Sequence, residues 1–164
     1  MINFQITPLD HTLLTYLFEL DEKELQHLGA VKMTADRNTG YPCRISLTNA
    51  GIGEEVILLH YKHHQTDSPY QASGPIFIRN NVKSAKLEVN EIPAMLTDKL
   101  LSIRSYTNKG MLRKADVIDG KELRQALITA FTNAEINYIH IHSAKEGCYH
   151  CTVNRTTPEH KKSS

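Results

Sequence analysis

The segment YIHIHSAKEGCYHC, Tyr138–Cys151, indicates the fold more directly than any other part of the chain. Apolar and polar residues alternate on both sides of a short polar connection, which is the pattern of a β-hairpin. The apolar residues are Ile139 and Ile141 on the first arm, and Tyr149, Cys151 and Val153 on the second.

This pattern predicts a register for the hairpin. Directly opposed residues share a face of the sheet, and the two apolar sets should share the core face. His142 would then oppose Cys148, and His140 would oppose His150. Histidines two apart on a strand lie about 7 Å apart along the backbone, so their rings can converge on one ion. Three imidazoles and a thiolate form an acceptable zinc set, whereas a polar, partly solvated sheet face is the plainer interpretation.

Further hairpins are expected elsewhere in the chain. Tyr41–Leu47 and Glu54–Lys62 flank a turn-rich segment, as do Leu101–Tyr106 and Met111–Ile118. Shorter strands are predicted at Asn3–Thr7, Ala30–Ala35, Ile76–Ile78 and Ser84–Val89.

Helices are predicted between these strands. One should begin at Thr7-Pro8, and another at Asp21, where Glu24 completes a capping box. A short helix should follow Pro93, and a longer one, capped by Asp119, should bury Leu123, Leu127 and Phe131 on one face. These elements predict a single α+β domain over residues 1–157, with a polar frayed tail at 158–164. Its mostly antiparallel sheet would be bent, with a barrel-like form as one alternative, and about three helices would pack outside it.

Composition limits the partners. The chain has 164 residues and a net charge of +1, which disfavours nucleic acid and leaves a small anionic molecule as the expected ligand. No apolar stretch is long enough for a membrane span, and the N-terminus does not resemble a signal peptide. Three cysteines at unrelated spacings suggest free thiols in a reducing cytoplasm. A homodimer is compatible with the sequence.

Several residues outside the hairpin could carry chemistry. Cys43 follows Tyr41-Pro42 and precedes Arg44, and a nearby guanidinium can activate a thiol, although a cysteine in an apolar strand is more often inert. In the loop His63–Ser73, Asp67 could act as a general base. Ligand contacts are predicted for Arg44, Ser68, Tyr70, Ser73 and Arg104, where arginines could clamp a carboxylate or phosphate.

Three motifs, YPCRISL, DSPYQASGPIF and YIHIHSAKEGCY, resemble segments of a bacterial family catalogued as domain of unknown function 1203. They occur in the family's order, and the resemblance covers nearly the whole chain. The resemblance implies no known activity, cofactor or substrate. Since His150 and Cys151 lie outside the matching motif, it favours a set of His140, His142 and Cys148 over a closed four-ligand zinc site.

Two functional hypotheses follow, with a scaffold or oligomerisation role as a third. In the first, the protein is an enzyme acting on a small molecule, with Cys148 or Cys43 as nucleophile and Asp67 as base, or with His140 and His142 as metal ligands for zinc. In the second, it is a non-catalytic binding module for a small anionic ligand.

Overall fold

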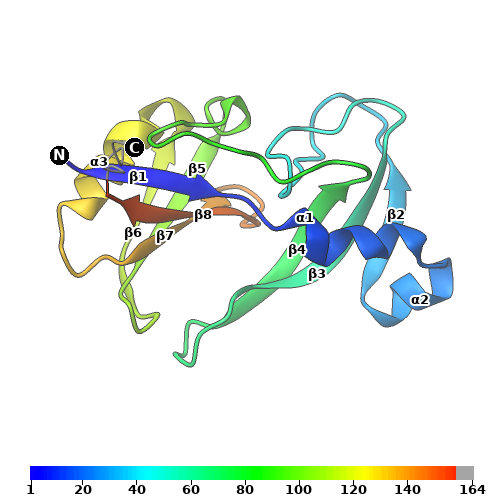
Figure 1. Ribbon diagram of the computed structural model, residues 1–164, viewed down its shortest axis with the longest axis horizontal. Helices are drawn as coiled ribbons and strands as arrows, with labels where there is room; N and C mark the ends of the chain where they lie inside the picture. The colour runs from blue at the N-terminus through cyan, green and yellow to red at the C-terminus, as the bar shows by residue number, and fades with distance from the viewer. Residues whose placement is uncertain (158–164) are drawn as a thin grey trace, which may run out of the picture.

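The computed structural model describes residues 1–157, and these form two antiparallel sheets that lie side by side (Figure 1). The larger sheet has the strand order β1-β8-β7-β5-β6, and the smaller has the order β2-β3-β4. The predicted α+β class is confirmed, but within residues 1–157 the sheets do not close into a barrel. The strands are β1 (Asn3–Thr7), β2 (Ala30–Thr34), β3 (Glu55–His64), β4 (Ala72–Arg79), β5 (Leu100–Tyr106), β6 (Leu112–Asp119), β7 (Tyr138–Ser143) and β8 (Tyr149–Thr156). The helices are α1 (His11–Leu14), α2 (Glu22–His27) and α3 (Leu123–Phe131), with 3₁₀ turns η1 (Thr15–Glu19), η2 (Ala94–Leu96) and η3 (Gly120–Glu122).

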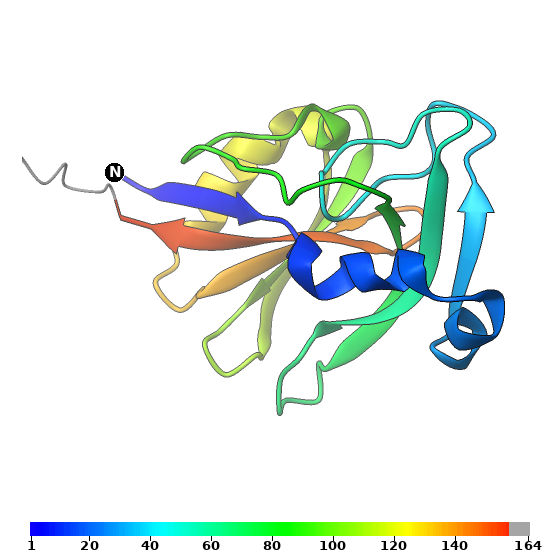
Figure 2. The same ribbon diagram turned by 45° about the vertical axis from the view of Figure 1, so that its right-hand side comes forward.

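Helix α3 covers one face of the five-stranded sheet (Figures 1 and 2). Its buried residues are Leu123, Leu127 and Phe131, as the three- and four-residue spacing predicts. They share a core with Ile139 and Ile141 of β7 and with Cys151 and Val153 of β8. Because strand residues alternate between faces, the intervening histidines of β7 lie on the opposite face, away from α3.

The three-stranded sheet packs against the N-terminal helices. Asp21 and Glu24 form the predicted capping box of α2, and Gly29 follows this helix with a φ of +67°. The core beneath these helices includes Leu17, Leu25, Ile57, Leu59 and Ile78. The start predicted for the first helix at Thr7-Pro8 is wrong. Strand β1 continues through Thr7, and Asp10 caps α1 by accepting a hydrogen bond from the Thr12 N–H.

The prediction of strands at Tyr41–Leu47 and Ser84–Val89 is also wrong. The first segment forms turns, closed by hydrogen bonds such as Cys43 N–H to the Thr48 carbonyl at 3.0 Å. Leu47 has a φ of +55°, which interrupts an extended chain. Isolated bridges join Pro42 to Asn49 and Cys43 to Phe77. The apolar composition of this segment therefore reflects its burial and not a place in a sheet.

Strand β3 extends beyond its predicted end and pairs with β4 on one side and β2 on the other. It continues through His63 and His64, which the sequence pattern assigns to a loop. The pairing with β4 slips between Tyr61 and His64, so β3 holds one extra residue there. A β-bulge of this kind changes where the side chains point, and this one lies at the end of β3 that approaches the larger sheet.

None of the helices within residues 1–157 combines the length and the apolar character needed to cross a bilayer. The predicted frayed tail, residues 158–164, lies outside the described part of the chain.

Candidate metal centre and adjoining cavity

Aromatic and imidazole rings fill the space between the end of β3 and the face of the larger sheet opposite α3. His63 lies 5.0 Å from His142 and 6.2 Å from His140, measured between ring centroids. The ring of Tyr149 stacks on that of His63 at 5.2 Å, with an interplanar angle of 6°. His140 and His142 are fully or almost fully buried, and His63 is partly buried. Strands from both sheets thus contribute to one cluster.

Within residues 1–157, His63, His140 and His142 form a group that could hold a metal ion. Each offers one ring nitrogen, and the three atoms lie within 4.8 Å of one another. Each residue also has a buried ring nitrogen without a hydrogen-bond partner. Buried polar atoms are normally satisfied, so three orphans in one cluster call for an explanation. We call this group the histidine triad.

The hydrogen bond of His142 sets its tautomer. Its Nδ1 lies 2.9 Å from the carbonyl oxygen of Gly147, so Nδ1 carries the proton and donates it. The lone pair of His142 is therefore on Nε2, the nitrogen that has no partner. Metal-binding histidines commonly hold the second ring nitrogen in this way, against a backbone carbonyl.

The triad is held in its neutral form. Burial is the main cause that lowers the pKa of His140 and His142 to about 3 and that of His63 to about 4. The positive charge of the half-buried Arg104 acts in the same direction on all three. Arg104 pairs directly with His140 across β5 and β7 and so shares its face of the sheet. Neutral imidazole is the form that binds metal ions.

His64 borders the triad but differs from it, because both of its ring nitrogens have partners. Its Nδ1 lies 2.7 Å from the Tyr70 carbonyl oxygen, and its Nε2 lies 2.5 Å from the Tyr138 hydroxyl. Nδ1 therefore donates and Nε2 accepts. The His64 ring also contacts Tyr106 and His140, with centroids 4.2 and 4.9 Å away. His64 supports the cluster and has no free nitrogen for an ion.

A second β-bulge corrects the register predicted for the hairpin. His142 pairs with Tyr149 and Ile141 pairs with Cys151, which leaves His150 as the extra residue of β8. His140 pairs with Thr152. The expected pairings of His142 with Cys148 and of His140 with His150 are therefore wrong. The bulge turns Tyr149 onto the histidine face, while Cys151 and Val153 stay in the core as expected.

Cys148 and His150 line a separate cavity of about 330 Å³ together with Arg44. Tyr149 connects the two places, because its ring stacks on His63 while its backbone carbonyl accepts a hydrogen bond of 2.7 Å from Arg44 Nε. We call this the Arg44 cavity. Of the predicted Cys–His set, His140 and His142 therefore belong to the triad, whereas Cys148 lines the cavity.

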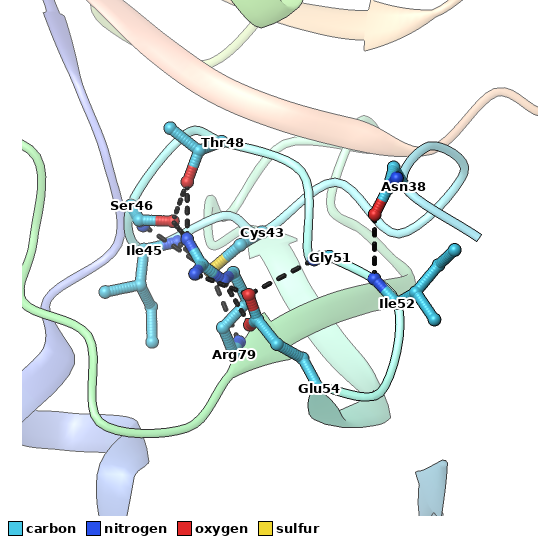
Figure 3. A network of polar contacts seen from close by, with 9 residues as sticks. All are labelled: Asn38, Cys43, Ile45, Ser46, Thr48, Gly51, Ile52, Glu54 and Arg79. Carbon is cyan, nitrogen blue, oxygen red and sulfur yellow. Dashed lines mark hydrogen bonds and ion pairs between the residues drawn. The ribbon is translucent and has the colours of Figure 1, made fainter. Parts of the chain in front are cut away.

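Cys43 lies in neither place. It is fully buried, and its sulfur accepts hydrogen bonds from the backbone N–H groups of Ile45, Ser46 and Arg79 at 3.3–3.4 Å (Figure 3). Beside it, Arg79 forms a bidentate ion pair with Glu54 at 2.7 and 2.8 Å. With three backbone N–H donors, the Cys43 sulfur stabilises the turn that contains it.

The predicted ligand-binding loop serves mainly to join the tips of two hairpins. Ser68 Oγ donates to the Gly110 carbonyl at 2.7 Å, and Ser73 Oγ lies 3.0 Å from His60 Nε2. The Tyr70 carbonyl is the partner of His64. Asp67 is exposed, and none of these four residues lines the Arg44 cavity.

We expect alkylation of the native protein to distinguish its three cysteines. Cys43 and Cys151 are buried, Cys148 is partly exposed, and burial raises the pKa of the Cys151 thiol to about 12. Iodoacetamide at neutral pH should label Cys148 at least about tenfold faster than the other two, because thiolate and access are both required. Peptide mass spectrometry over time measures the three rates. Equal rates in the folded protein would contradict this assignment.

A family model described as "Protein of unknown function (DUF1203)" matches residues 40–155, more than half of the chain. The chain belongs to the DUF1203 family. The resemblance inferred from the three sequence motifs is thereby confirmed. The DUF1203 match includes the whole triad and every residue that lines the Arg44 cavity. No curated protein and no solved structure matches the chain.

Sequence reasoning placed His140 and His142 together but missed His63. The signal was present, since His63-His64 directly follows the predicted strand Glu54–Lys62, and a strand two residues longer includes both. No sequence pattern indicates that Lys99 lines the cavity, because Lys99 lies in a polar segment before β5.

Proposed function

We propose that the histidine triad binds a divalent transition metal of the zinc class. The observation that carries this proposal is the convergence of three mainly buried imidazoles, each of which offers one ring nitrogen within 4.8 Å of the others. Each imidazole also has a buried nitrogen without a hydrogen-bond partner. Imidazole ligands suit zinc, copper, nickel and iron, and do not suit calcium or magnesium.

The spacing of the nitrogens is compatible with binding after a small adjustment. In a tetrahedral site with Zn–N bonds of 2.0–2.1 Å, the nitrogens are about 3.3 Å apart. The triad nitrogens, within 4.8 Å of one another, would have to approach by up to about 1.5 Å. Rotation of the partly buried His63 ring supplies part of this movement, while the Gly147 carbonyl holds His142 in place.

Three protein ligands leave a fourth position for water or a substrate, the arrangement typical of catalytic zinc sites and not of structural ones. Zinc in such a site lowers the pKa of a bound water and polarises carbonyl groups. Arg104 would add a positive charge beside that position, which favours an anionic reactant. The function we propose is therefore metal-assisted chemistry on a small molecule, by an enzyme of the reducing cytoplasm, where the three free cysteines would persist.

A cobalt titration tests the metal site. Protein purified without a tag and stripped with EDTA should bind one equivalent of Co²⁺ and develop the visible absorption of a four- or five-coordinate centre. His63→Gln should abolish this spectrum because it removes the ligand from the smaller sheet. His60→Gln is the matched control, since His60 lies on the same strand, is exposed and bonds Ser73. A featureless wild-type spectrum, or equal spectra for both variants, would refute the proposal.

A further inference from the structure

The Arg44 cavity lies between the two sheets and has chemically different sides. Leu58, Pro75 and Phe77 from β3 and β4 supply an apolar wall. The turn between β7 and β8, together with Arg44 and Lys99, supplies a polar side. The volume of about 330 Å³ is at the lower end of small-molecule sites. It could hold roughly ten non-hydrogen atoms, if each occupies about the volume of a water molecule.

Arg44 is the central group of the polar side. The residue is 2% exposed, and its side chain donates to two backbone carbonyls, those of Tyr149 and Pro42. Among residues 1–157 it has no carboxylate partner within ion-pair distance. Burial lowers the pKa of Arg44 to about 10, so it remains charged at neutral pH. A buried cation without a counter-charge is costly, and an anion bound in the cavity would supply one.

The residues that line the Arg44 cavity carry one excess positive charge, because Arg44 and Lys99 are positive and Glu146 is negative. Lys99 is half-buried, and burial lowers its pKa from the usual value. Glu146 contributes one negative charge and accepts a hydrogen bond from the Ser143 hydroxyl. Two cations and one carboxylate favour a ligand with a single negative charge, because a second one would be repelled by Glu146.

His150 provides an independent indication of a ligand. It is 1% exposed and lines the cavity, yet neither of its ring nitrogens has a hydrogen-bond partner among the described residues. A neutral imidazole has one donor and one acceptor, and leaving a buried polar group unpaired costs about 1–3 kcal/mol. A ligand oxygen in the cavity could accept the N–H of His150.

From this geometry we propose that the Arg44 cavity binds a small organic carboxylate with an apolar body, of roughly ten non-hydrogen atoms in all. The carboxylate contacts Arg44 and Lys99, and the apolar body lies against Phe77, Leu58 and Pro75. This assignment does not depend on the metal site, because no residue of the triad lines the cavity.

Benzoate is a suitable probe because it has one carboxylate and a flat apolar ring. In EDTA-treated protein followed by ¹⁵N NMR, we expect benzoate to bind with a Kd of about 1 mM or tighter. Shifted amides should cluster at residues 146–150 and at Phe77. Benzamide, which lacks the charge, should bind at least about tenfold more weakly, and bound benzoate should slow the alkylation of Cys148.

Lys99→Gln should weaken benzoate binding about three- to tenfold. Lys145→Gln is the matched control, since it removes the same charge from an exposed residue of the adjoining turn that does not line the cavity. Arg44→Gln should abolish binding. If that variant does not fold, the comparison of Lys99→Gln with Lys145→Gln still tests the proposal.

Several results would overturn the proposal. They are equal binding of benzamide and benzoate, shifts centred outside the cavity, tighter binding of inorganic phosphate than of benzoate, and equal effects of the two lysine substitutions. Binding that vanishes after EDTA treatment and returns with Zn²⁺ would also overturn it, because the carboxylate would then be a metal ligand. Loss of Co²⁺ binding alone would refute the metal site and leave the cavity intact.

Discussion

His142→Gln is expected to lower the affinity of the protein for Zn²⁺ by at least about a hundredfold, or about 2.7 kcal/mol. The substitution removes one of three ligands and the hydrogen bond by which the Gly147 carbonyl orients it. Competition against a chromophoric chelator at pH 7.5 measures the affinity. Glutamine is close to histidine in size, so the change tests the ligand atom more than the packing.

His64→Gln is the control for that measurement. His64 contacts His140 and is equally buried, but both of its nitrogens already have partners. Its replacement should change the Zn²⁺ affinity by no more than a few-fold. If both variants lose affinity equally, the whole cluster and not the triad governs binding. If neither loses affinity, His142 is not a ligand.

The metal-free protein should lose stability in mild acid. Burial lowers the pKa of His140 and His142 to about 3, whereas histidine in an unfolded chain titrates near 6.5. Between these values the unfolded chain binds more protons than the folded protein, so stability is complete above pH 6.5 and falls as the pH drops towards 3. At pH 5 each of the two residues should remove about 2 kcal/mol from the free energy of unfolding.

Urea unfolding of EDTA-treated protein at pH 7.5, 6 and 5 measures this loss. His150→Leu should reduce the pH dependence, since burial also lowers the pKa of His150 strongly and leucine cannot be protonated. His27→Gln, a change at an exposed residue of α2, should leave the dependence as it is. An unfolding free energy that stays constant from pH 7.5 to 5 would contradict the burial of neutral imidazoles.

The sequence predicts two of the three residues of the histidine triad and only part of the Arg44 cavity. Alternation along β7 places His140 and His142 on one face, and their joint role as metal-ligand candidates follows from the residue types. The role of Arg44 as an anion contact remains a prediction, now with a cavity and with Lys99 and His150 beside it. Asp67 and Ser73 are exposed and lie outside the triad and the cavity, because the loop around Ser68 is fixed to the Gly110 turn.

Local patterns in the sequence determined the α+β class, the capping box of α2, the buried face of α3 and the two-residue alternation of β7. These features depend on residues that lie close together in the sequence, so they can be predicted from the sequence alone. Tertiary structure decided the rest. One bulge at the end of β3 and another at His150 displace the pairing by one residue, and a one-residue displacement moves side chains to the other face. His63 therefore meets His140 and His142, while Tyr149 leaves the core face, and neither outcome follows from alternation.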